Sequence, residues 1–99
     1  MASTKRKKLS KVVPVFEQIG FSPAESAELV RKSHLLDEIQ DIVKDKRYTH
    51  KDLIQLTGLG QSHVSELLNG KVSRFSTEKL IVILENLGAI VEIRVKRGA

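Results

Sequence analysis

The fold is decided by residues 49–70, which read THKDLIQLTGLGQSHVSELLNG. Thr49 is a residue type that caps the start of a helix, and Asp52 follows where a carboxylate faces free backbone N–H groups. Gly58 falls where helices commonly end in the left-handed conformation, and Asn69-Gly70 repeats that signal later. The stretch therefore predicts two short helices joined by a tight turn, with a glycine stop after the second.

The second of these helices has an apolar side and a polar side. Val64, Leu67 and Leu68 recur at helical spacing and are predicted to point inward. Two short helices joined in this way form a helix-turn-helix, which places its second helix in the major groove of DNA. The predicted contacts to base edges are polar residues of that helix, namely Gln61, Ser62, His63, Ser65 and Glu66. Any small helical hairpin needs a similar turn, so the motif alone leaves a purely structural role open.

These residue types suit base recognition in different ways. A glutamine such as Gln61 can pair bidentately with adenine, and a glutamate can accept a hydrogen bond from cytosine. Glu66 is less simple, because an acid facing DNA is repelled by the phosphates. We expect Glu66 either to read a base or to turn toward a cation.

The net charge of +5 is unevenly distributed along the chain. Residues 44–74 carry six basic and three acidic side chains, whereas residues 12–43 carry two basic and six acidic ones. Positive charge around the helix pair suits attraction to phosphates. The predicted phosphate contacts are His50, Lys51, Asn69, Lys71 and Arg74. For each of them the alternative is an ordinary solvated surface residue.

The segment resembles the Xre/Cro-like helix-turn-helix family, which includes many phage repressors. The residues that match the family pattern are His50, Ile54, Gly58, Val64 and Leu67. Ile54 stands where the family usually has alanine, which implies a different packing of the two helices. Gly60 stands where Ser or Thr commonly caps the second helix, and glycine is an acceptable substitute there.

The resemblance extends over about residues 15–97, and the chain looks like a compact subgroup of the family that is often found as antitoxins of HigA type. It implies a mainly α, lambda-repressor-like domain that acts as a dimer. It also implies that such a chain represses its own operon and binds a toxin, often a basic ribonuclease. The acidic residues 12–43 would suit a basic partner, or they simply keep a helix face solvated.

The regions before the motif divide into a tail and a long helix. Residues 1–11 hold five basic side chains and no acid, and we interpret them as a disordered arm. The arm is either a solvated tail or a segment that reaches DNA.

Residues 12–99 form the single predicted domain. Ser22, Pro23 and Glu25 form a strong helix start, and the helix is expected to run to about Lys46, with a possible break near Ser33-His34. Its apolar stripe consists of Leu35, Ile39, Ile42 and Val43.

The region after the motif predicts one more helix and a strand. Ser76 can cap a helix whose inner face consists of Leu80, Ile83, Leu84 and Leu87, and Gly88 ends it. Residues 89–96 then alternate, because Val91, Ile93 and Val95 are separated by charged residues, as in a half-buried strand. A lone strand needs a partner, which is either residues 12–16 of the same chain or the same strand of a second chain. We favour the second chain, since a two-fold dimer would present two recognition helices to a palindromic operator.

Composition excludes several other functions. The chain has no cysteine, which excludes disulfides, thiolate catalysis and cysteine-zinc sites. Its three histidines lack the spacing of metal ligands, so we expect no metal, no cofactor and no enzymatic activity. No apolar run is long enough to span a membrane, and a cytoplasmic protein is expected. The chain has three phenylalanines, one tyrosine and no tryptophan, too few for an RNA platform of stacked aromatic rings, and Phe75 is expected in the core.

The sequence thus predicts a dimeric, sequence-specific regulator that binds double-stranded DNA and represses transcription. The resemblance to HigA-type antitoxins implies that it is the antitoxin of a toxin–antitoxin pair. Two alternatives remain open at this point. One is a protein-binding neutraliser of a basic toxin in which DNA binding is secondary, and the other is a stand-alone phage-type repressor.

Overall fold

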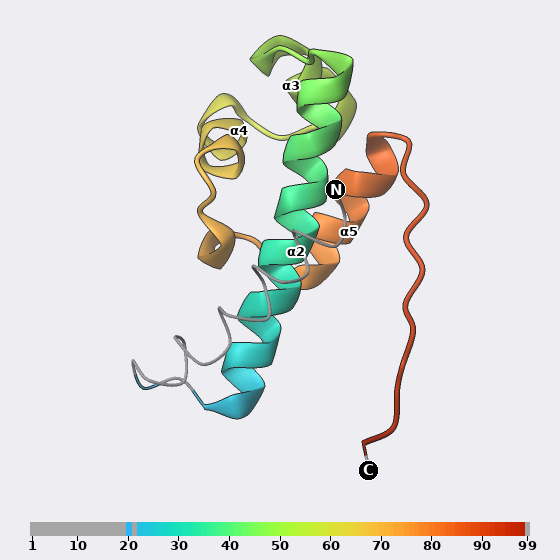
Figure 1. Cartoon of the computed structure of the whole chain (residues 1–99). Coiled ribbons are helices and arrows are strands. Elements are labelled where there is room, and N and C mark those ends of the chain that lie inside the picture. Colours follow the sequence, from blue (N-terminus) through green and yellow to red (C-terminus); the bar gives the residue numbers. More distant parts are fainter. Residues whose placement is uncertain (1–19, 21, 99) are drawn as a thin grey trace.

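The computed structural model describes residues 20 and 22–98; residues 1–19, 21 and 99 lie outside the description. The described chain is helical, as Figure 1 shows. Its elements are α2 (Pro23–Lys46), α3 (His50–Thr57), α4 (Gln61–Leu68), the 3₁₀ turn η1 (Val72–Arg74) and α5 (Thr77–Asn86). The predicted basic arm (1–11) and the segment 12–16 fall outside the described residues.

Helix α2 begins at the predicted start signal. The backbone N–H of Ser22 donates to Glu25 Oε1 at 3.1 Å, and the N–H of Glu25 donates to Ser22 Oγ at 3.1 Å. The Ser22 backbone N–H, and after it the Ser22 hydroxyl, hold the pKa of Glu25 below its ordinary value because their hydrogen bonds favour the charged carboxylate. Pro23 occupies the first turn, where its missing N–H costs nothing. The reciprocal bonds satisfy backbone donors that a helix start otherwise leaves unpaired.

The break considered near Ser33-His34 does not occur, because α2 is continuous for 24 residues. Neither residue is a helix breaker, and each lowers helix propensity only by some tenths of a kcal/mol. Helix α2 ends at Arg47, which adopts the left-handed conformation with φ 54°. The N–H of Tyr48 donates to the carbonyl of Val43 at 3.0 Å, and that of Arg47 donates to Lys44 at 3.2 Å. This pair of bonds is a Schellman motif formed without glycine.

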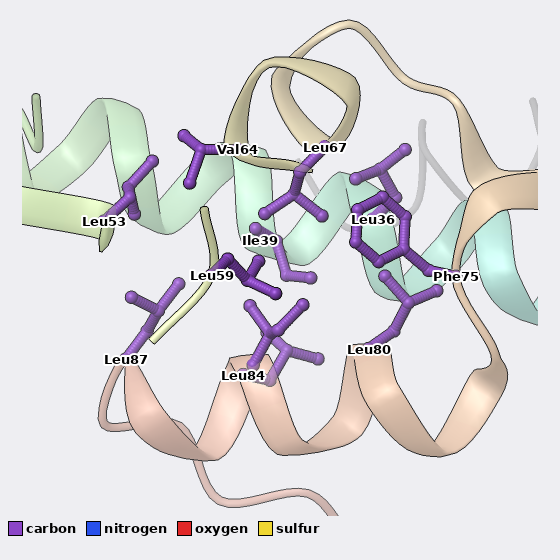
Figure 2. Packing of buried hydrophobic residues seen from close by; sticks show 11 residues of the cluster. Leu36, Ile39, Leu53, Leu59, Val64, Leu67, Phe75, Leu80, Leu84 and Leu87 are labelled. Atoms are coloured by element: carbon purple, nitrogen blue, oxygen red, sulfur yellow. The ribbon is translucent and has the colours of Figure 1, made fainter. Parts of the chain in front are cut away.

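A single apolar core lies between α2, α3, α4 and α5, as Figure 2 shows. Among the described residues it consists of Leu36, Ile39, Leu53, Leu59, Val64, Leu67, Phe75, Leu80, Ile83, Leu84 and Leu87. The most extensive packing between helices joins α2 to α5. The predicted inner face of α5 and the burial of Phe75 are confirmed.

The burial of individual residues is finer than sequence spacing indicates. Leu36, which the predicted stripe of α2 omitted, is buried, while Leu35 only packs against the edge of the core. Leu56 lies three residues after the fully buried Leu53 on α3 but is 40% exposed. Leu68 points inward, as predicted, and packs against the core while being only partly buried. In each case the spacing gave the correct side of the helix, while the neighbouring helices determine how much of that side they cover.

Residues 89–98 form no strand within the described part of the chain, although a strand was predicted over 89–96. They leave the end of α5 as an extended segment (Figure 1). Val91 packs against the core, whereas Ile93 and Val95 are 77% and 86% exposed. An extended segment becomes a strand only when a second strand supplies backbone partners, so the predicted pairing of this segment stays a prediction.

Candidate nucleic-acid interface

The first helix of the pair is fixed at both ends by its own sequence. At its start, the N–H of Thr49 donates to Asp52 Oδ2 at 2.8 Å, and the N–H of Asp52 donates to Thr49 Oγ1 at 3.1 Å. At its end, Gly58 has φ 74°, a conformation that side chains with a Cβ rarely adopt. The turn after Gly58 buries Leu59 in the core, so the geometry between α3 and α4 is held by packing as well as by backbone.

Helix α4 is held against the body of the protein along one side. Val64 and Leu67 are completely buried, and both lie on the inner face (Figure 2). The side chain of Gln40, on α2, donates through Nε2 to the backbone carbonyl of Leu68 at 3.4 Å. That carbonyl belongs to the last turn of α4, where intrahelical donors run out. The helix therefore has one orientation relative to α2, and its opposite side faces outward.

The predicted base-contacting residues fall into two groups. Gln61, Ser62 and His63, in the first turn of α4, are exposed. Ser65 and Glu66, one turn later, are half-buried. Gly60 precedes the helix and provides no side-chain cap, so the chain leading into the exposed turn carries no bulk. The first turn of α4 is thus the part of this surface most open to a groove.

The end of α4 redirects the chain in a defined way. Gly70 has φ 77° and donates to the carbonyl of Leu67 at 3.2 Å, while Lys71 donates to the carbonyl of Glu66 at 3.1 Å. These bonds form a second Schellman motif, here with glycine in the left-handed position. The short turn η1 follows, and the N–H of Arg74 donates to the carbonyl of Lys71 at 3.1 Å. This short turn packs against α2.

Two predicted contact residues, one on α4 and one on η1, meet in this region. Arg74 Nε lies 3.0 Å from Glu66 Oε2 in a salt bridge. The side chain of Arg74 is 65% exposed, and that of Glu66 is 22% exposed. Of the two possibilities considered for Glu66, the structure has the carboxylate turned toward a cation.

The remaining predicted phosphate contacts, His50, Lys51, Asn69 and Lys71, are all exposed. His50 and Lys51 begin α3, and Asn69 and Lys71 follow α4. Within the described residues, no side-chain hydrogen bond or salt bridge joins these four residues to one another. Their placement is compatible with phosphate contacts, and their role stays a prediction.

Sequence reasoning did not identify two residues that position this surface. Gln40 is polar and lies on α2, far from the motif in sequence, so no local pattern points to its bond with the end of α4. Leu59 lies between two glycines in the turn, and its burial depends on α2 and α5. An apolar residue inside an otherwise polar turn is the one signal that could have indicated Leu59.

Within the part of the chain that the structure describes, no helix combines the length and the apolar character that crossing a bilayer requires. The same residues contain no cluster of three or more potential metal ligands from His, Asp and Glu.

Comparison with known proteins agrees with this geometry. The sequence matches a family described as a helix-turn-helix domain over residues 15–96, which is most of the chain. No curated protein matches the chain. The match covers α3, the turn and α4, together with α2 and α5, whose side chains complete the core.

Proposed function

Because the chain belongs to the helix-turn-helix domain family, we propose that it is a sequence-specific regulator that binds double-stranded DNA through α4. The observation that carries the proposal is that one side of α4 is buried in the core while the opposite side is exposed to solvent. Val64 and Leu67 are fully enclosed, while the residues of its first turn are open to solvent. A helix held in this way can enter a major groove without losing its packing.

The proposed division of labour follows from the chemistry of the side chains. Gln61, Ser62 and His63 reach base edges, and Gln61 has the amide that pairs with adenine. Lys51, Lys71 and Arg74 contact phosphates, which fix the register of the helix on the duplex. We propose no catalytic role for this surface.

The central test is selection of duplexes from a random library, followed by binding measurements at several salt concentrations. Specific enrichment is expected, and the logarithm of affinity should fall with the logarithm of salt by about 0.9 for each neutralised phosphate. An affinity independent of salt, or a library that yields no enriched sequence at low salt, would refute the proposal.

Two substitutions separate the proposed roles. Gln61→Ala should relax preference at one base pair by about 1–3 kcal/mol, whereas Lys71→Ala should weaken binding to all sequences alike. Lys79→Ala is the matched control, because Lys79 is an exposed lysine on α5, away from α4. Equal effects of Gln61→Ala and Lys71→Ala on every sequence would contradict the assignment.

We further propose that the regulator is a homodimer that acts as a repressor on a palindromic operator. Support comes from residues 89–98, where Ile90, Ile93 and Val95 are exposed apolar side chains. A groove of about 690 Å³ lies beside them, formed by α2, α5 and residues 89–94. Pairing of this segment with its copy would cover apolar surface and satisfy the backbone of both segments.

The dimer is tested by sedimentation of the full chain, a chain lacking residues 90–99, and the variant Ile93→Asp. The full chain should sediment as a dimer, and both altered chains as monomers with lower affinity for the selected duplex. A truncated chain that still sediments as a dimer would show that the contact lies elsewhere.

A second candidate function, neutralisation of a basic toxin, is favoured by the acidity of α2. Between residues 23 and 43 there are five acidic and two basic side chains, and Glu25 and Glu38 are exposed. The test is co-purification with the product of the adjacent gene. Glu25→Gln with Glu38→Gln should weaken the complex, while Glu85→Gln on α5 should leave it unchanged. No complex, or equal weakening by Glu85→Gln, would contradict this role.

A further inference from the structure

We propose that Glu66 reads no base and instead positions Arg74, whose outward edge makes the contact with DNA. The inference rests on the proposed function of α4 and changes the role assigned to one of its residues. It follows from the geometry of the ion pair, from the different exposure of the two side chains and from the chemistry of a guanidinium group.

Backbone geometry and core packing bring the two residues together. The Schellman motif at Gly70 turns the chain out of α4, η1 packs against α2, and Arg74 at the end of η1 lies within reach of Glu66. Both ends of the pair are therefore anchored, Glu66 by the helix and Arg74 by the 3₁₀ turn. An ion pair between two anchored residues costs less side-chain entropy than one between flexible surface chains.

The pair uses only one edge of the guanidinium. The contact to Glu66 Oε2 is made by Nε, at 3.0 Å. An arginine has five N–H donors in a planar fork, so the terminal nitrogens keep donors that can reach two acceptors at once. The Arg74 side chain is 65% exposed, which leaves this part of the fork accessible to a phosphate or a guanine edge.

Glu66 is poorly placed to read a base itself. Its side chain is only 22% exposed, whereas Gln61, Ser62 and His63 belong to the exposed class. The salt bridge also neutralises a negative charge that would otherwise repel the phosphates. A carboxylate engaged with Arg74 fixes the direction of the guanidinium, and the positive charge of Arg74 offsets the repulsion between this carboxylate and the phosphates.

The experiment is a double-mutant cycle on the duplex that the wild-type protein selects from a random library. Glu66→Ala should weaken binding about tenfold, although it removes a negative charge from the DNA-facing side. Arg74→Ala should weaken binding at least as much. In the Arg74→Ala background, Glu66→Ala should cause no further loss of affinity and should raise it slightly, because the carboxylate then has no guanidinium to position and only repels the phosphates.

Two conservative variants sharpen the test. Glu66→Gln keeps an oxygen that accepts from Nε, so affinity should stay within about threefold of the wild type. Arg74→Lys should behave like Arg74→Ala, since one ammonium group cannot hold the carboxylate and present a planar fork together.

In the free protein, the Nε–H resonance of Arg74 should be slow to exchange with water, and Glu66→Ala should abolish that protection. Thermal unfolding of each variant checks that the fold is retained.

The alternatives give opposite results. If Glu66→Ala in the otherwise wild-type protein strengthens binding to every sequence, Glu66 is merely a repulsive acid. If it removes preference at one base pair even in the Arg74→Ala background, Glu66 reads that base. Additive effects of the two alanine substitutions, or an Nε–H signal insensitive to Glu66, would also overturn the inference. Failure of the proposed function is distinct, because then the wild type selects no duplex at all.

Discussion

Helix α4 and the C-terminal segment 89–98 are similar in length, and both combine apolar with polar side chains. They differ in whether a single chain can bury their apolar side chains and pair their backbone hydrogen-bonding groups. The apolar residues Val64 and Leu67 of α4 are fully buried. In the segment, Ile93 and Val95 remain exposed. The difference lies in the backbone, because a helix forms its hydrogen bonds internally and a strand forms them with a neighbour.

The comparison shows which part of the predicted DNA-binding unit is specified by a single chain. The orientation of α4 is determined by side chains of α2 and by the turn before it, all within the same molecule. The relative placement of two such helices on a palindromic operator would depend on contacts between chains. The two properties can therefore be disturbed separately by substitution.

The largest expected difference is between one buried and one exposed apolar side chain. Leu67→Ala should lower the free energy of unfolding by about 2–5 kcal/mol, because it leaves a cavity in a fully packed core. Ile93→Ala should lower the free energy of unfolding of the dilute monomer by less than about 0.5 kcal/mol. Urea unfolding of both variants checks this, and a comparable loss from Ile93→Ala would show that the segment packs within one chain.

A smaller difference in stability is expected when each of two glycines is replaced by alanine. Gly70→Ala should destabilise the protein by about 1 kcal/mol, since φ 77° is strained for a residue with a Cβ. Gly98→Ala is the matched control, because Gly98 has open space around it and no positive φ. Thermal unfolding distinguishes them, and equal midpoints would mean that the end of α4 relaxes into another conformation.

The smallest expected effect is a gain in stability from a substitution at the end of α2. Arg47 occupies a left-handed position without being glycine, so Arg47→Gly should stabilise the protein by up to about 1 kcal/mol. Arg97→Gly in the C-terminal segment removes the same charge without this conformational relief and should be neutral. Chemical denaturation of the pair tests the difference, and a loss of stability in Arg47→Gly would indicate that the arginine side chain stabilises the helix end.

The features that the sequence predicted correctly are those encoded over a few residues. The caps at Ser22 and Thr49 and the turn at Gly58 depend on local backbone donors and on permitted φ values, and each is confirmed. The helix-turn-helix itself follows from them, together with the burial of Val64 and Leu67.

The features that were missed depend on distant or absent neighbours. Leu36 is missing from the predicted stripe of α2 because burial is set by which helix covers a face. The partner of Glu66 depends on a chain reversal at Gly70, so helical periodicity alone offered two possibilities for that residue. The predicted strand needs backbone partners that no described residue provides.

The Schellman endings also determine which amide protons should resist exchange with solvent. Tyr48, Lys71 and Ala89 lie beyond the ends of their helices, yet their amides donate to helix carbonyls at 3.0, 3.1 and 3.0 Å. Deuterium uptake should therefore be slow as far as Ala89 and fast immediately after it. If the segment pairs with a second copy at high concentration, protection should extend beyond Ala89 in an alternating pattern, which would report the assembly without any substitution.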